Sequence, residues 1–474
     1  MSLFTILRAE WTRFLAHPVY RWIMITTALL LVGSALWSGA GVRGYRAEVA
    51  TQQAQWHQAR EQAIADAPDH EAARGKETEA VNSAYAVGRG DLGATRMAAT
   101  GAAVLGFQQY SVLPAALRAT VESRHTDGRV SGALGNPLLA ETGLPSFPAM
   151  AVLLLSLAAL ALTAGMVQED RERGIWRLVC AQCSVGPATV FAMALLVRWF
   201  AVSALGATAS LCAFALDPDA AAAPFMAWLS GLAAFVAFWV LASGLMSLLP
   251  VSAGAAMTGA LGLWLMLTFA VPAAVAWAAE RAMPMPSRLA LIVQLRTVQM
   301  DTEAREAELL AAWYAAHPDQ RPLSERMPST PGWPVTFMPR FLEQEARLRP
   351  SGRAFDEARA RQAAMMEQRA WLSPPLALMM LADRLAGADA QRYARYVDAV
   401  DRFEDRWRAF FMQRIMAYRG LTRQDFAAMP VFAADEAARI DAVVSEGPAP
   451  RCLAIAVAVL ALLVFAGRRS LYRP

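Results

Sequence analysis

The sequence predicts an all-α membrane protein with six transmembrane helices, two helical extracytoplasmic insertions and both termini in the cytoplasm. Hydrophobic residues make up 56% of its 474 residues and charged residues only 18%, whereas charged residues make up roughly 25% of an ordinary soluble domain. Long uncharged runs alternate with two polar segments. The net charge of +4 is spread along the chain, which excludes a nucleic-acid binder because such proteins concentrate positive charge on one face.

Each span is predicted where about 18 or more residues pass without a charge, because about 20 helical residues cross the hydrocarbon core of a bilayer. The first such run could also be a signal peptide cleaved near residues 38–40. Its length and the arginines before it, Arg8, Arg13 and Arg21, favour an anchor. The predicted spans are 22–40, 148–167, three within 199–279 (199–216, 224–249 and 254–279) and 451–467.

The charges between the spans predict the orientation. Six spans place residues 1–21, 168–198 and 468–474 on one side, where the charges sum to +6, while the other side sums to −2. Positive residues are retained in the cytoplasm. We therefore expect these three short segments to be cytoplasmic, and the two long polar segments, 41–147 and 280–450, to be exported.

Both exported segments are predicted to be helical, since no strand-like alternation of useful length appears in either. In the first, good helix formers fill 45–64 and 71–87, and a break follows at 88–93. In the second, helices are expected at 286–316, at 344–371 and from Gln391 onward. A proline-rich connection at 317–339 and the turn Ser373-Pro374-Pro375 separate these helices.

The helix from Gln391 carries aromatic and aliphatic residues at steps of three and four, with charges between them, which is typical of an amphipathic helix. Such a stripe more often forms a core than a ligand site, and we expect the same here. Its members are Tyr393, Tyr396, Val397, Val400, Phe403, Trp407, Phe410 and Phe411.

The usual catalytic motifs are missing. A phosphate-binding P-loop ends in Gly-Lys-Ser/Thr, but the single lysine, Lys76, lies in Gly-Lys-Glu on a predicted helix. His70-Glu71 begins like a zinc-protease helix, yet Arg74 stands where the second histidine would fall. No nucleophile elbow or dinucleotide fingerprint occurs. The chain is therefore predicted to be neither an enzyme nor an ATPase, and to carry no cofactor.

Sulfur-containing residues offer two weaker candidates. Cys180 and Cys183 have the spacing of a metal or redox pair, but no second pair or nearby histidine accompanies them, which favours an incidental role. Several exported methionines could bind copper(I), although packing is the favoured use. These methionines are Met283, Met285, Met365, Met366, Met379 and Met380.

Arg198 is a candidate functional charge at a membrane edge, because a charge beside a long apolar run is costly and needs a reason. One interpretation is that its guanidinium snorkels to lipid phosphates at the cytoplasmic surface. The other is an internal ion pair or a contact with a passing substrate. Asp217 and Asp219, in contrast, are interpreted as a plain exported turn.

The segment after the second span resembles the coupling helix of permease subunits of type-2 ABC transporters. It is acidic and contains a glycine, reading Gln-Glu-Asp-Arg-Glu-Arg-Gly-Ile-Trp-Arg-Leu-Val over residues 168–179, and Ser184-Val185-Gly186-Pro187 follows. In that family a hydroxyl residue usually follows the glycine and paired leucines come next. Ile175 and Val179 depart from this pattern, but the segment follows the second span, as it does in that family.

Two further segments carry the resemblance over nearly the whole chain. Residues 7–18, with Leu7-Arg8-Ala9-Glu10-Trp11 and His17-Pro18, look like the amphipathic cytoplasmic helix that leads into the first span of these permeases. Residues 372–376, then 385–389 and Arg392 before the aromatic helix are similar to a subfamily known as a domain of unknown function. Its members carry two large periplasmic insertions, after the first and fifth spans.

The resemblance implies a multi-pass subunit of a bacterial inner membrane that borrows its energy. Its implied partners are a separate ABC ATPase subunit, a second permease (a homodimer or a related paralogue), membrane lipids, and a transported substrate whose class is left open. Contact with the ATPase is expected at Glu169, Asp170, Arg171, Glu172, Arg173 and Gly174.

Two other classes of protein stay open from the residues alone. One is a multi-span assembly or sensor protein whose periplasmic helices bind a partner; anchoring by itself, however, does not require six spans. The other is a secondary transporter, which usually shows acidic residues or broken helices at a midplane site. Neither feature is visible in the predicted spans.

Overall fold

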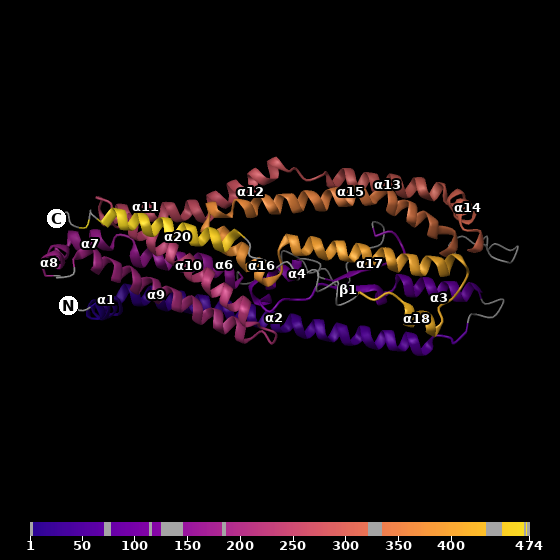
Figure 1. The fold of residues 1–474 in the computed structure, drawn as a ribbon, viewed down its shortest axis with the longest axis horizontal. Helices are drawn as coiled ribbons and strands as arrows, with labels where there is room; N and C mark the ends of the chain where they lie inside the picture. The colour runs from indigo at the N-terminus through magenta and orange to yellow at the C-terminus, as the bar shows by residue number, and fades with distance from the viewer. Residues whose placement is uncertain are drawn as a thin grey trace.

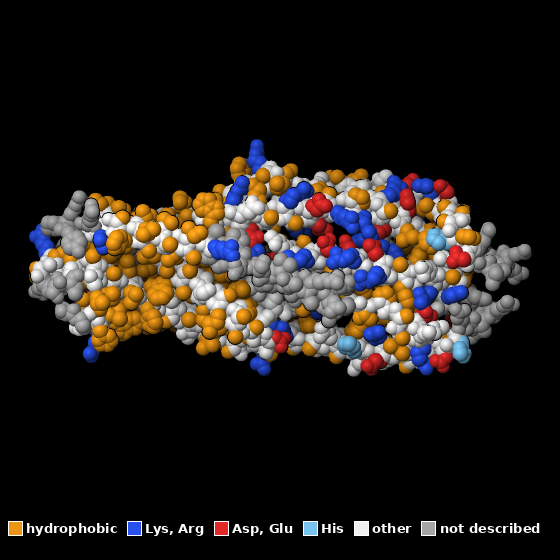
Figure 2. Space-filling model, viewed as in Figure 1, with side chains coloured by type: hydrophobic (Ala, Val, Ile, Leu, Met, Phe, Trp, Pro, Cys, Tyr) orange, Lys and Arg blue, Asp and Glu red, His pale blue; other side chains and the backbone are white. Residues whose placement is uncertain are grey.

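The computed structural model is an elongated helical molecule with both termini at the same end (Figure 1). It describes residues 3–70, 77–112, 116–124, 146–182, 186–320, 334–432, 448–468 and 471. A membrane-type bundle occupies the end that holds the termini, and the polar segments extend from the other end of the bundle. In the space-filling view, hydrophobic side chains cover the bundle and charged side chains cover the extension (Figure 2).

Five helices in the described chain are long and apolar enough to cross a membrane, which confirms a multi-span membrane protein in coarse outline. A sixth, α20, is a shorter apolar helix over Leu453–Gly467 within Pro448–Gly467. The bundle also contains the amphipathic helix α1 (Leu3–Ala16). The five spans are α2 (Pro18–Asp66), α6 with α7 (Phe147–Thr163 and Met166–Glu172), α9 (Pro187–Ala215), α10 (Ala222–Met246), and α11 to α12 (Ala253–Leu265 and Val271–Ala282), joined by a π-helical turn, η3, at Met266–Ala270.

The first span and the first exported helix form one continuous helix, α2, rather than two. Its 49 residues make a rod of about 72 Å, more than twice the roughly 30 Å hydrocarbon core. Glycines let neighbours approach this rod closely. A Cβ atom on Gly39 would lie 2.9 Å from the carbonyl oxygen of Ala213, and one on Gly41 would lie 2.3 Å from the Phe107 ring.

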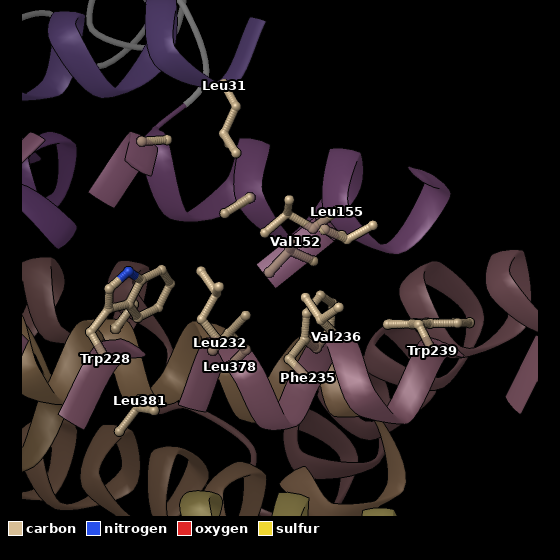
Figure 3. Packing of buried hydrophobic residues seen from close by; sticks show 14 of the residues in the cluster. Leu31, Val152, Leu155, Trp228, Leu232, Phe235, Val236, Trp239, Leu378 and Leu381 are labelled. Atoms are coloured by element: carbon tan, nitrogen blue, oxygen red, sulfur yellow. The ribbon is translucent and has the colours of Figure 1, made fainter. Parts of the chain in front are cut away.

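The bundle core lies between α2, α6 and α10, and a helix of the second polar segment completes it (Figure 3). This helix, α16 (Pro374–Ala386), packs Leu378 and Leu381 against α10. Gly231 makes room, since a Cβ atom there would lie 2.3 Å from Leu381 Cδ2. The largest fully buried side chains of the core include Leu31, Phe147, Leu155, Trp228, Phe235 and Trp239.

Among the described residues, the polar extension is helical except for one short antiparallel ribbon, in which Ala94–Arg96 (β1) pairs with Ala116–Arg118 (β2). The expectation of no strand is therefore wrong here, because three residues are too few to display an alternation. The remaining exported elements are α3 (Glu77–Arg89), η1 (Asp91–Gly93), η2 (Ala103–Leu105), α4 (Phe107–Val112), α13 (Arg288–Ala304), α14 (Glu306–Ala316), η4 (Pro318–Gln320), α15 (Pro334–Gln368), η5 (Ala370–Leu372), α17 (Ala390–Met416) and α18 (Arg423–Ala428).

The aromatic stripe of α17 is a core element, as predicted. Tyr396, Phe403, Trp407 and Phe411 are at most 1% exposed. Phe403, Trp407 and Phe411 pack with residues of α3, α14 and α15, whereas Tyr396 joins the core of the bundle. The Trp407 indole N–H donates to the carbonyl of Gly88 at 2.8 Å, so the predicted break at 88–93 is where the first insertion meets this helix.

Asp217 and Asp219 are part of a clamp at the outer end of the bundle, which corrects their interpretation as a plain turn. Arg46 of α2 donates from Nε to Asp217 Oδ1 at 2.5 Å and from Nη1 to Asp219 Oδ2 at 2.8 Å. It also donates from Nη2 to the carbonyl of Thr100 at 2.7 Å. The side chain of Asp217 is fully buried, so the α9–α10 turn is fixed to α2 by a charged contact.

Candidate functional site

The candidate site is a pair of short helices at the end of the bundle that holds both termini. The chain leaves α6, turns at Gly165, forms α7, turns again at Gly174 and forms α8 (Ile175–Gln182). Both glycines have positive φ angles, 78° and 75°, which L side chains rarely adopt. Gly174 of the predicted motif therefore separates α7 from α8.

Helix α7 and its first turn are attached to the α10–α11 turn by four polar contacts. Gln168 Nε2 donates to the carbonyls of Met246 at 3.0 Å and Leu249 at 3.2 Å. Glu172 Oε1 accepts a hydrogen bond from Ala253 N, the first amide of α11, at 2.9 Å. A carboxylate is stabilised there because the N-terminus of a helix carries a partial positive charge. Ser247 accepts from Gly165 N at 3.1 Å. Movement of α7 would therefore displace the start of the fifth span.

Asp170 attaches α7 to the N-terminal helix α1. Its carboxylate is buried and accepts from Arg13 Nη2 at 2.5 Å. Glu10 lies 4.0 Å from Arg13 Nη1, and burial raises the pKa of Glu10 above its ordinary value, against the opposing effect of Arg13 and Arg198. These charges line a small cavity of about 50 Å³ between α1, α7 and α9.

Arg198 lies inside α9 rather than just before a span, because this helix begins at Pro187. Its guanidinium is buried and does not reach the surface: Nε donates to the carbonyl of Leu162 at 2.6 Å and Nη1 to that of Ala194 at 2.9 Å. The guanidinium carbon also lies 5.7 Å from the centre of the Tyr20 ring. Arg198 therefore satisfies a carbonyl at the end of α6, where a helix leaves such groups unpaired, and the snorkelling interpretation is wrong.

Helix α8 has one attached face and one exposed face. The Trp176 indole N–H donates to the carbonyl of Leu471 at 3.1 Å, and the ring is buried. On the other face Leu178 is 59% exposed and Ile175 is 37% exposed. Arg177 is also exposed. An exposed apolar pair beside arginines is typical of a surface that binds another protein.

The residues predicted to contact the ATPase therefore divide into two groups. Asp170 and Glu172 make contacts inside this chain, Glu169 pairs with Arg173 at 2.6 Å, and Arg171 is half-buried. The exposed surface continues instead from Arg173 and Gly174 into α8. Sequence reasoning did not single out the exposed apolar pair Ile175 and Leu178, although their spacing of three residues could have indicated one exposed helix face.

The cysteine and histidine candidates do not form a metal site in the described chain. Cys180 is exposed on α8, whereas Cys183 lies outside the described residues. His70 is described, but Glu71 and Arg74 are not. Within the described ranges no group of three or more His, Cys, Asp or Glu residues is placed to hold a metal ion. Met379 and Met380 pack against apolar clusters.

A comparison with known protein families matches one segment of the polar extension. A family model described as a domain of unknown function (DUF3526) matches residues 288–435, the segment from α13 to just past α18. No curated protein and no solved structure matches the chain. The domain with the aromatic core is thus a recognised unit, carried by a multi-span membrane protein.

Proposed function

We propose that this chain is the permease subunit of an ATP-driven ABC transporter of a bacterial inner membrane, exporting a substrate or extracting it from the membrane. The observation that supports the proposal best is the α7–α8 pair. One of its helices is tied to two spans and to α1, and the other presents an apolar and basic face away from the bundle. A separate ATPase subunit binds that face and supplies the energy.

In this proposal the ATPase drives α8, and α7 transmits the movement. Gln168 and Glu172 carry it to the α10–α11 turn, while Asp170 carries it through Arg13 to α1. Such short helices act as levers when bound subunits close on ATP, because packed helices shift between discrete arrangements. The chain supplies the path across the membrane and no catalytic group.

A second permease, either an identical copy or a relative, completes the transporter. The fifth span is the least buried of the five, and it exposes Leu261, Leu265 and Phe269. In an ATPase dimer two permeases are engaged, and symmetric pairing buries equivalent faces of the two. We propose that the α11–α12 face is where they meet.

The experiment is co-expression of the chain with the ATPase encoded beside it, followed by purification through a tag on the chain. Wild type is expected to retain the ATPase and to stimulate its ATP hydrolysis. The double variant I175E/L178E is expected to lose most of the bound ATPase, since each buried apolar side chain contributes about 1.5–3 kcal/mol. V431E is the matched control, because Val431 is 40% exposed on the exported domain.

Asp170→Asn separates binding from coupling. The substitution removes a buried charge on the inner side of α7 and leaves the face of α8 unchanged. The ATPase should therefore remain bound while its stimulation falls. Recovery of no ATPase with wild type would contradict the proposal and favour the assembly or sensor class. Equal retention by I175E/L178E would exclude α8 as the docking face.

A further inference from the structure

A groove of about 510 Å³ lies on the outside of the bundle, between α9 and α20 with α10 as its floor. It lies at the end of the bundle that holds the termini, because it is lined by the first turns of α9 and the last turns of α20. Its volume falls within the roughly 300–1,000 Å³ of small-molecule sites. This end of the molecule carries the apolar band of Figure 2.

The lining of the groove is apolar along its length and basic at one end. Phe191 and Leu195 of α9 and Val240 of α10 are buried, and Ala192 and Ala461 keep the space between the helices open. Phe465 of α20 and Arg468, the residue after the end of that helix, close the end nearest the C-terminus, with the Arg468 guanidinium carbon 3.6 Å from the centre of the Phe465 ring. No carboxylate of a described residue pairs with Arg468, and the sequence continues with Arg469.

We propose that this groove is a binding site for an anionic phospholipid, with one acyl chain along the apolar lining and the phosphate at Arg468. The apolar lining of the groove suits the acyl chain of such a lipid. An arginine at the level where a span leaves the membrane suits its phosphate. A span from a second copy fits less well, since an apolar helix would leave the guanidinium without a partner. The site does not depend on the ATPase and is thus independent of the proposed function.

The test is native mass spectrometry of the full chain, purified in mild detergent and titrated with phosphatidylglycerol. Wild type is expected to hold one lipid more tightly than the rest. R468Q should bind it about fivefold more weakly, since an arginine near the surface contributes about 1 kcal/mol to anionic lipid binding. A192F should also weaken binding by filling the groove. The affinities of wild type and R468Q for phosphatidylcholine should differ much less than their affinities for phosphatidylglycerol.

R281Q is the matched control. Arg281 also lies beside an aromatic ring at the end of a span, 5.7 Å from the centre of the Trp277 ring, but it does not line the groove. Its loss should leave the affinity unchanged. Absence of a preferred lipid on wild type, or equal affinity of wild type and R468Q, would overturn the proposal. So would a loss of self-association in A192F with unchanged lipid binding, because the groove would then hold a second copy.

Discussion

The ion-pair partners of buried charged residues cannot be read from the sequence around them. Glu404 is fully buried beside Arg408, with Nη2 and Oε1 at 3.2 Å, and Arg124 from the first insertion lies 3.7 Å from its other carboxylate oxygen. Arg46 pairs with Asp217 although 171 residues separate them. The sequence displays the charges but not their partners. From the sequence, Asp217 is therefore interpreted as a plain exported turn, and the partner of Asp170, which is 157 residues away, is not predicted.

Replacing Arg46 tests the clamp at the outer end of the bundle. R46A should destabilise the protein by roughly 3–5 kcal/mol, because it leaves a buried carboxylate without a partner. Thermal unfolding in detergent measures the effect as a lower melting temperature. R43A on the same helix is the control, since Arg43 is exposed and surface substitutions usually change stability by less than about 0.5 kcal/mol. Equal melting temperatures for the two variants would contradict the clamp.

Asp383 gives the stability of the exported domain a pH dependence. Burial raises the pKa of Asp383 to about 6, against the opposing hydrogen bond from Gln109, and nearby Asp389 adds to the rise. The folded state therefore holds this proton more tightly than the unfolded chain, whose carboxyl has a pKa near 3.8. The contribution to stability is present below that lower value and is lost as the pH rises to about 6.

Asp383→Asn removes this titration while keeping an acceptor for Gln109. The melting temperature of the variant relative to wild type should therefore be higher at about pH 7.5 than at about pH 4.5. The same difference at both pH values would show that Asp383 does not keep its proton in the folded protein.

Among the elements, sequence patterns predicted those whose environment is uniform. Helix α17 was predictable because its stripe is buried along its length, first in the bundle core and then in the core of the polar extension, and α10 because it is apolar throughout. The long helix α2 was divided in two, since its composition changes where it leaves the bundle although the backbone does not. The sequence predicts a helix over 344–371, after a proline-rich connection at 317–339. Helix α15 instead starts at Pro334 and runs through Pro339, because packing of buried residues such as Val335 and Met338 outweighs a local preference against helix.

Two glycines of α2 test how this helix packs. G41A should destabilise the protein by about 1–3 kcal/mol, because the new methyl group would overlap the Phe107 ring. G44A is the control on the same helix, since nothing lies within 4 Å of a Cβ atom there. It should be neutral or stabilising by about 0.5–1 kcal/mol, as alanine favours helix over glycine. A melting temperature lower for G44A than for G41A would contradict the packing.

The whole molecule is a helical bundle with a polar extension. The end of the bundle that holds both termini carries α7, α8 and the apolar groove, while the family-matched domain lies in the extension. The division into an apolar bundle and polar segments was predictable from composition. The sequence could not predict the fit of α16 against α10, because that contact depends on a glycine in one segment and two leucines in a distant one.

Thiol accessibility across the membrane tests the central claim, that α8 faces the cytoplasm and the aromatic domain is exported. Cys180 is exposed on α8 and serves as a native probe once the other three cysteines are replaced by serine; Asp398→Cys places a probe on the exposed side of α17. With a membrane-impermeant thiol reagent, Cys180 should react only in inside-out vesicles and the α17 probe only in intact cells with a permeable outer envelope. Labelling of Cys180 in those intact cells, with protection of the α17 probe, would contradict the account.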